Sequence, residues 1–392
     1  MNKLKVCELI DSYYPVIDGA IQCAKHYTEQ LCDKMDAHLA VPKAGKKDNY
    51  KDNEKFKVLR CLSFSAPEKY RCGLPSLDCK FKKAFKEENF QLLHTHSPFA
   101  MGRFALKYAK KNKIPVVATL HTQYHLDFLR TLKGNKALTK FMINYIMKVY
   151  KNADSVWTVS EKACECLRSY GYKGNIEVVR NGTDYHYPDN ASELIDIVNE
   201  KHNLKGQENV FIFVGRMSWY KNIKLILDSL SSAKKQGSTF KALFVGGGFD
   251  LKAIIKYTEE IGLLDNCIFT DRVSDRDLLQ GYYLRSDAMI FPSTFDTSGI
   301  VKVEAAAHKK ACILIKDSCS AEMVEDGVNG FLCEENVESL SDVIVKLCSN
   351  PSLMKSAGDN AYSSIYRTWE DVAEEVYQKY QKIIKDYKEK HN

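Results

Sequence analysis

Short apolar runs alternate with longer amphipathic stretches along almost the whole chain, and this alternation constrains the fold more than any other feature. The apolar runs have the length and the β-branched and aromatic content of buried strands. In the first half we predict strands at 5–10, 38–41, 56–59, 92–95, 115–119, 155–159 and 176–179, with helices near 20–34, 98–112, 135–151 and 161–170. Such alternation favours a parallel sheet with helices on both faces.

The same pattern restarts at residue 209, after a polar segment at about 185–208 that we interpret as the break between two domains. The second series has strands at 209–215, 241–246, 267–270, 288–291 and 312–315, separated by helices at 221–235, 249–262, 275–285 and 299–308. Further helices are predicted to start at 350–351 and at 368–370. The sequence therefore predicts an α/β protein with two Rossmann-like, doubly wound domains, whose ligands bind in a cleft at the carboxyl ends of the strands.

Length and composition are those of a globular protein with two domains. The chain has 392 residues, of which 45% are hydrophobic and 27% charged. It contains no run of about 18 apolar residues, and Glu8 interrupts the first apolar stretch, which we interpret as a strand and not as a signal peptide. The thirteen cysteines are scattered, mostly within apolar runs, which is typical of reduced thiols in a cytoplasmic protein.

Charge is distributed unevenly between the two halves. Residues 1–190 contain 32 Lys and Arg against 20 Asp and Glu, a net charge of +12, and the remainder has a net charge of −5. The basic half suggests an anionic partner such as a membrane surface or an acidic polymer. The alternative is that its lysines merely solvate helix faces, and both interpretations stay open at this point.

Three predicted strand ends in the first half carry candidate binding residues. Residues 14–20 follow the first strand, and Gly19 there lets the backbone approach a ligand while the helix start offers N–H groups to a phosphate. His94 and His96 end one strand, and His121 ends the next. Histidines in these places can bind a sugar or move a proton. A metal site is the weaker hypothesis, because no Asp, Glu or Cys lies at a convincing ligand spacing.

Two further motifs belong to the second half. At 214–222 a strand ends in Gly215-Arg216, and Lys221 follows at a helix start, so two cations lie where a diphosphate leaving group could bind. At 291–307 two acids lie eight positions apart, Asp296 in a loop and Glu304 in the following helix. Ser298 and Gly299 form the helix start between them, so sugar and ribose hydroxyls could be held on either side of a phosphate.

Taken together, these motifs resemble the family-four retaining glycosyltransferases of the GT-B fold. The resemblance spans essentially the whole chain and is closest to bacterial enzymes that glycosylate membrane lipids or other cell-surface acceptors. It rests on the order and spacing of 15–19, 94–98, 119–121, 181–184, 215–222, 245–248, 296–304, 326–331 and the final helix led by Trp369. It implies an acceptor-binding domain at 1–190, a nucleotide-sugar-binding domain at 191–367, and a crossover helix at 368–392 that packs back on the first domain.

The resemblance also implies roles for single residues. Arg216 and Lys221 would bind the donor diphosphate, Glu304 the ribose, and Asp296 the transferred sugar, where the family usually has Glu. Backbone N–H groups of the donor site would come from Gly19, Ser298, Gly299 and Ile300, next to Thr297, and Val273 would lie near the base. His121 would lie beside the anomeric carbon, with Asp18, His94 and His96 on the acceptor side. The family implies retention of configuration and no metal or other cofactor, with cationic side chains and helix starts replacing a divalent ion.

A metal-dependent transferase would need an Asp-x-Asp in its site. Residues 275–277 match these letters, but they open a helix and are better interpreted as N-terminal capping charges.

The acceptor is predicted from two basic stretches of the first half. Residues 80–86 interleave lysines with Phe81 and Phe85, and 128–151 carry six cations around an apolar segment at 141–146. Such stretches can rest on anionic headgroups. We therefore expect a cytoplasmic enzyme, peripheral on the inner face of the membrane, that transfers a hexose from a UDP-sugar such as UDP-glucose to a diacylglycerol-type or lipid-linked acceptor, with no nucleic-acid partner.

Two alternatives stay open. One is a soluble transferase that extends a cell-surface polysaccharide precursor, and the other is a degenerate scaffold that binds a sugar nucleotide without turnover. Within the same fold, the runner-up is a retaining phosphorylase or a non-hydrolysing epimerase. The phosphorylase would need a lysine for pyridoxal phosphate, which nothing in the sequence marks.

Overall fold

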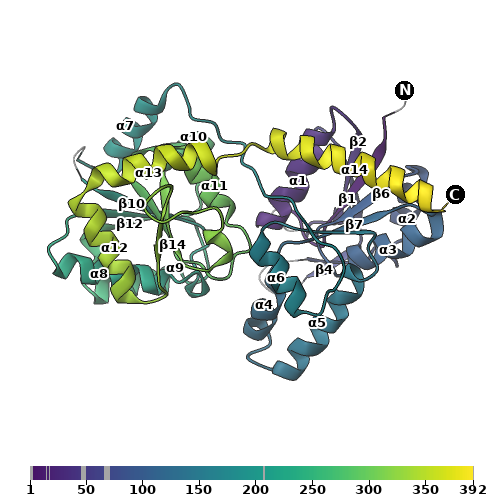
Figure 1. The fold of residues 1–392 in the computed structure, drawn as a ribbon, viewed down its shortest axis with the longest axis horizontal. Helices are drawn as coiled ribbons and strands as arrows, with labels where there is room; N and C mark the ends of the chain where they lie inside the picture. The colour runs from purple at the N-terminus through teal and green to yellow at the C-terminus, as the bar shows by residue number, and fades with distance from the viewer. Residues whose placement is uncertain are drawn as a thin grey trace. The chain divides into compact units, whose positions relative to one another are not determined.

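The computed structural model describes residues 3–14, 16, 18–45, 50–65, 71–205 and 208–391. The chain forms two compact units, Met1–Asn181 with Trp369–Asn392, and Gly182–Thr368 (Figure 1). Pro15 and Ile17 of the predicted 14–20 turn lie outside the described residues. Each unit is built around its own parallel sheet.

The sheet of the first unit has the order β3-β2-β1-β6-β7-β8-β9, with every pairing parallel. Its strands are β1 (Lys5–Leu9), β2 (Asp36–Pro42), β3 (Lys57–Cys61), β6 (Leu92–Thr95), β7 (Val116–Leu120), β8 (Ser155–Thr158) and β9 (Glu177–Val178). All seven predicted strands are confirmed. The strand order reverses between β1 and β6, and such a switch point is where ligands bind to open parallel sheets.

The helices of this unit include the predicted ones. They are α1 (Gly19–Leu31), α2 (Cys79–Glu87), α3 (Ala100–Asn112), α4 (Tyr124–Thr131), α5 (Lys136–Tyr150) and α6 (Glu161–Ser169). The short helix α4 and an antiparallel hairpin, β4 (Ser63–Ser65) with β5 (Arg71–Gly73), were not predicted. Both are too short to show a clear hydrophobic period in the sequence.

The second unit contains a six-stranded sheet of order β12-β11-β10-β13-β14-β15, again entirely parallel. Its strands are β10 (Val210–Val214), β11 (Lys241–Val245), β12 (Cys267–Thr270), β13 (Ala288–Phe291), β14 (Ala311–Ile315) and β15 (Phe331–Cys333). The helices are α7 (Ala191–His202), α8 (Ile223–Lys235), α9 (Leu251–Glu260), α10 (Arg276–Arg285), α11 (Ile300–Ala307), α12 (Val337–Ser349) and α13 (Pro351–Ser364). Here the switch point lies between β10 and β13.

The interpretation of 185–208 as a polar break between domains was wrong in one respect. Most of that segment is the helix α7, which packs on α10 through Leu194 and Leu284. Arg285 secures the contact by donating to the carbonyl of Lys205 at 2.9 Å. The apolar face of α7 is narrow and its other faces are strongly polar, so composition alone suggested a linker. The second unit begins at Gly182, before α7.

The last helix, α14 (Trp369–His391), belongs to the first unit although it follows the whole of the second in the chain. It lies beside α1 (Figure 1). Trp369 stacks on His26 with ring centroids 5.1 Å apart and meets Tyr27 edge-on. None of the helices in the described ranges is both long and apolar enough to cross a membrane.

Candidate functional site

The predicted site residues fall in both units, and each set is described by itself. In the second unit, Arg216 and Lys221 follow β10, and Asp296 to Gly299 follow β13. Because β10 and β13 are neighbours at the switch point, these two loops lie at the same edge of the sheet. This topology brings together residues that are about eighty positions apart in the sequence.

The loop after β10 is held by glycine contacts that admit no side chain. A Cβ at Gly246 would lie 2.1 Å from the carbonyl oxygen of Gly215, and Gly246 also has a φ of +136°. Met217 donates its backbone N–H to Gly247 at 3.0 Å. Asn222 then ties this loop to the next one, because its side chain donates to the carbonyl of Pro292 at 3.0 Å. The Val-Gly-Gly-Gly motif at 245–248 therefore fixes the position of the cationic loop.

Lys221 and Asp296 form a direct ion pair. The Lys221 Nζ lies 2.7 Å from both carboxylate oxygens of Asp296, and both side chains are partly exposed. Arg216 contacts the hydroxyl of Tyr220 at 3.5 Å, a long hydrogen bond. Two of the predicted site residues thus touch each other, and a diphosphate that bound Lys221 would have to compete with Asp296 for its ammonium group.

The start of α11 lies between Asp296 and Glu304. Gly299 caps it in a left-handed conformation, with a φ of +65°, and provides no side chain to bond the first N–H groups. The neighbouring Thr297 is buried, whereas Ser298 and Ile300 are partly exposed. Lys302 connects α11 to the segment around Ser320 by donating to the carbonyl of Ser320 at 2.8 Å. The helix N-terminus therefore has the geometry of an anion-binding site.

Glu304 lies one turn further along α11, where the hydroxyl of Tyr283 donates to its Oε2 at 2.7 Å. Burial, with a smaller contribution from the charge of Asp184, raises the pKa of Glu304 to about 7 against the lowering effects of Tyr283 and Arg276. Arg276 lies nearby, paired with Asp184 at 2.8 Å. Glu304 is thus a carboxyl group that changes its charge near neutral pH.

Two other predictions for the second unit can be compared with the structure. Val273, expected near the base, is partly buried against the hydrophobic core of this unit. The interpretation of 275–277 as capping charges is confirmed: Asp275 is the N-cap of α10 and accepts from the N–H groups of Asp277 at 3.0 Å and Leu278 at 3.1 Å.

In the first unit, Asp18 and Gly19 form the start of α1. The Asp18 carboxylate accepts from the backbone N–H of Ile21 at 2.9 Å and so caps the helix N-terminus. A carboxylate that also bound the acceptor, as predicted, would do so in addition to this capping bond. Gly19 is exposed as the first helical residue.

The three histidines differ in how they are placed. His94 and His96 are completely buried, whereas His121 is partly exposed. His96 bonds Glu8 through its Nε2 at 2.7 Å and His121 through its Nδ1 at 2.8 Å. The prediction that all three lie on the acceptor side stays a prediction. Of the three rings only His121 is partly exposed, so a direct contact with an acceptor would fall to His121.

Two members of this cluster, Glu8 and Tyr380, were not among the site residues predicted from the sequence. Burial raises the pKa of Glu8, but the neighbouring His94 and His96 outweigh it and lower the pKa to about 2. Tyr380 of α14 donates its hydroxyl to Glu8 at 2.8 Å. The only available signal was an acid inside an apolar strand. Tyr283, the partner of Glu304, was also missed and carried no signal at all.

This cluster also contains potential metal ligands that the sequence spacing did not reveal. The groups are Glu8 with His94 and His96, and Cys23 with His96 and His121. Ligands of one tetrahedral zinc, each at about 2.0–2.1 Å, are separated by roughly 3.3 Å. The contacts of His96 to Glu8 and His121 are 2.7 and 2.8 Å, which suits shared hydrogens better than a shared ion.

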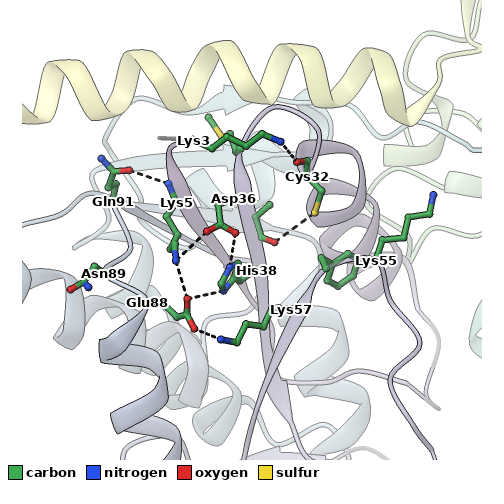
Figure 2. Close-up of a pocket in the computed structure, with 13 residues that line it drawn as sticks. Lys3, Lys5, Cys32, Asp36, His38, Lys55, Lys57, Glu88, Asn89 and Gln91 are labelled. Atoms are coloured by element: carbon green, nitrogen blue, oxygen red, sulfur yellow. Dashed lines mark hydrogen bonds and ion pairs between the residues drawn. The ribbon is translucent and has the colours of Figure 1, made fainter. Parts of the chain in front are cut away.

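A separate cavity of about 790 Å³ opens at the amino ends of β1, β2 and β3, away from these loops. Figure 2 shows Glu88 in its lining, bonded to Lys5 and Lys57 and facing His38. Lys5 also pairs with Asp36 at 3.1 Å. Two other lysines line the cavity, and of these Lys3 donates to the carbonyl of Cys32 at 2.9 Å.

The two basic stretches of the first unit also differ. Phe81 and Phe85 of α2 are buried in the core, so the prediction that 80–86 presents interleaved aromatics at the surface is wrong. The helix period puts both rings on the inner face and leaves only lysines outside. In contrast, Phe141 of α5 is 63% exposed and Leu138 is 42% exposed, and both are close in sequence to the exposed Lys136 and Lys140. We call these four residues the α5 patch.

Comparison with known proteins identifies the class of the chain. The family described as Glycosyltransferase Family 4 matches residues 17–187, and the family described as Glycosyl transferases group 1 matches 195–364. The two matches fall largely on the two structural units and together span most of the chain. The protein therefore belongs to the family 4 glycosyltransferases of the GT-B fold.

Particular relatives are distant but extend over the chain. The alpha-monoglucosyldiacylglycerol synthase of Acholeplasma laidlawii is 24% identical over 391 residues, covering 94% of this chain and 93% of the relative. The protein of the same name from Streptococcus pneumoniae is 21% identical and covers 88% and 78%. The crystal structure of Anabaena HepE in complex with UDP and glucose has a TM-score of 0.76 at 18% identity, covering 96% of this chain and 99% of that one.

Proposed function

We propose that this glycosyltransferase moves a hexose from a UDP-sugar, UDP-glucose first, to a diacylglycerol-type membrane lipid, with retention of configuration and without a metal ion. The observation that carries this proposal is the similarity to two alpha-monoglucosyldiacylglycerol synthases over nearly the full chain. The UDP and glucose bound in the HepE structure support the choice of donor.

The donor site would be assembled at the switch point of the second unit. Arg216, Lys221 and the start of α11, with the backbone of Thr297 to Ile300, would hold the diphosphate in place of a divalent cation. Val273 would border the base, and Glu304 would accept from ribose hydroxyls. Asp296 would exchange its bond with Lys221 for a bond to the sugar when the donor binds. The ion pair between Lys221 and Asp296 would thus hold the Lys221 side chain in place until the donor binds.

The reaction would leave the product with the configuration of the donor. The acceptor hydroxyl attacks the anomeric carbon on the face from which UDP departs, and an oxygen of the leaving diphosphate takes the hydroxyl proton. Arg216, Lys221 and the α11 N-terminus stabilise the charge that develops on the diphosphate. His121 and the backbone of Gly19 contact the sugar from the first unit.

A transfer assay tests this function directly. Radiolabelled UDP-, GDP- and ADP-sugars would be offered with diacylglycerol in mixed micelles, and separately with soluble saccharides, with and without EDTA. We expect a glucosyl lipid from UDP-glucose that is unaffected by EDTA and shows the small anomeric coupling constant of an α-glucoside by NMR. Transfer only to saccharides would favour a polysaccharide enzyme instead, and donor binding without any turnover would favour a scaffold.

The titration of Glu304 predicts a pH-dependent affinity for the donor. Its folded-state pKa of about 7 means that the group is neutral below this pH and ionised above it. An ionised carboxylate accepts from two ribose hydroxyls, so affinity for UDP-glucose is expected to rise up to tenfold per pH unit towards pH 7 and to level off above it. Calorimetry in buffers of different ionisation enthalpy should show proton release on binding at pH 6. In Glu304→Gln, both the proton release and the pH dependence should disappear, and their persistence would refute the assignment.

Membrane contact is proposed for the α5 patch. An exposed phenylalanine and leucine close in sequence to lysines can insert at the headgroup boundary while the cations contact anionic lipid. Phe141→Ser is expected to weaken binding to anionic vesicles about ten- to a hundredfold, since a buried phenylalanine contributes about 1.5–3 kcal/mol. Phe249→Ser is the matched control, because Phe249 of the second unit is 67% exposed. Flotation with anionic and neutral vesicles measures both, and equal binding to the two vesicle types would contradict the proposal.

A further inference from the structure

Glu8 is the only acid within β1, and it lies at the centre of a buried hydrogen-bond cluster. Its Oε2 lies 2.7 Å from the Nε2 of His96 and 3.2 Å from the Nδ1 of His94. Its Oε1 accepts from the hydroxyl of Tyr380 at 2.8 Å. All four side chains are completely or almost completely buried. A charge in such a place persists only if hydrogen bonds satisfy it, and here they come from His96, directly after β6, and from Tyr380 of α14.

The hydrogens of one branch of the cluster can be assigned in sequence. Tyr380 donates to Glu8, so its oxygen accepts from the Nδ1–H of His94. The Nε2 of His94 then accepts from the hydroxyl of Thr119 at 2.6 Å. Burial lowers the pKa of His94 to about 4, which agrees with a neutral ring carrying one hydrogen. In this branch each hydrogen of Tyr380, His94 and Thr119 is therefore matched to one acceptor atom.

The second branch leads from Glu8 to the surface. An ionised Glu8 can only accept, so the Nε2 of His96 must carry the hydrogen between them. If His96 is neutral, its Nδ1 has a lone pair and accepts from the Nε2–H of His121, 2.8 Å away. His121 then carries its own lone pair on Nδ1. Desolvation of the His121 ring, with the neighbouring His96 and His94, lowers its pKa well below its usual value although part of the ring is exposed, and this favours the neutral form.

We propose that Glu8, acting through His96, is a positioning residue that fixes His121 in the Nε2–H tautomer, and that Tyr380 of the last helix holds Glu8 in place for this task. The importance for transfer rests on the proposed function, in which His121 contacts the sugar. A fixed tautomer presents an acceptor nitrogen to a sugar hydroxyl, whereas the other tautomer would present a donor. The last helix would in this way contribute to the site without touching substrate.

Nitrogen NMR of the resting protein tests the tautomer without any substrate. With ¹⁵N-labelled histidine at pH 8, two-bond N–H correlations should show a hydrogen on Nε2 and a lone pair on Nδ1 of His121, assigned by loss of the signal in His121→Asn. In Glu8→Gln, the amide accepts at only one of its two ends, so a mixture of tautomers should replace the single form. A hydrogen on Nδ1 of His121 in the wild type, as a protonated His96 would impose, would overturn the proposal.

Kinetics test whether the tautomer is used. Glu8→Gln is expected to lower kcat about ten- to a hundredfold with little change in donor KM, as outer partners of functional histidines commonly do. Glu8→Asp, which keeps the charge, should recover part of the loss, and Tyr380→Phe, which keeps the packing, should show a smaller loss. A Glu8→Gln protein that is less stable to heat but transfers at the wild-type rate would reduce Glu8 to a structural role. If the wild type transfers no sugar at all, the proposed function fails while the spectra still decide the tautomer.

Discussion

Lys221→Ala is expected to lower kcat/KM for sugar transfer by about 10²–10³-fold, the largest change in activity that we expect from a single substitution. Lys221 is fixed in the loop after β10 and is only 2.7 Å from Asp296, so its ammonium group is already oriented at the switch point. A diphosphate that leaves without a metal depends on such fixed cations. The loss should appear in initial rates of transfer from UDP-glucose, measured at saturating lipid acceptor.

Stability should hardly change in the same variant. The Lys221–Asp296 pair is partly exposed, and pairs of this kind contribute about 0–1 kcal/mol to the free energy of unfolding. Lys224→Ala provides a matched control, because Lys224 lies one turn away, is exposed, and pairs with Asp228 and Tyr257, away from the predicted site residues. If Lys221→Ala kept activity within about threefold of the wild type while folded, the diphosphate assignment would be wrong.

Trp369→Ala is expected to destabilise the first unit by about 3–5 kcal/mol, the usual cost of removing a large buried aromatic side chain. Trp369 is the first residue of α14 and packs on His26 and Tyr27 of α1. Its removal leaves a cavity at the point where the last helix returns to this unit. For a unit of this size the midpoint of thermal unfolding should fall by about 10 °C.

Scanning calorimetry can separate the two units in this experiment. The transition of the first unit should move while that of the second, Gly182–Thr368, should not. Lys382→Ala is the control, because Lys382 is exposed on the same helix. An unchanged first transition in Trp369→Ala would mean that the packing of α14 contributes little to stability.

Most of the regular structure was predictable, because buried parallel strands are continuous apolar runs and their spacing by amphipathic helices is visible in one sequence. The errors have physical reasons. Helix α7 has a narrow apolar face, so its composition suggested a linker. The aromatics of 80–86 face inward because the helix period places Phe81 and Phe85 on one side, and a list of residue types does not show this.

The sequence by itself determined the two sheets, the positions of Arg216, Lys221, Asp296 and Glu304 at strand ends and a helix start, and the family. These are local properties, because a strand and the loop that follows it consist of consecutive residues. Only the tertiary structure decided which side chains meet. It paired Lys221 with Asp296, it gave Glu304 the hydroxyl of Tyr283, and it brought Tyr380 to Glu8 from the other end of the chain. Contacts of this kind depend on sheet order and on where the last helix packs, and no short stretch of sequence encodes either.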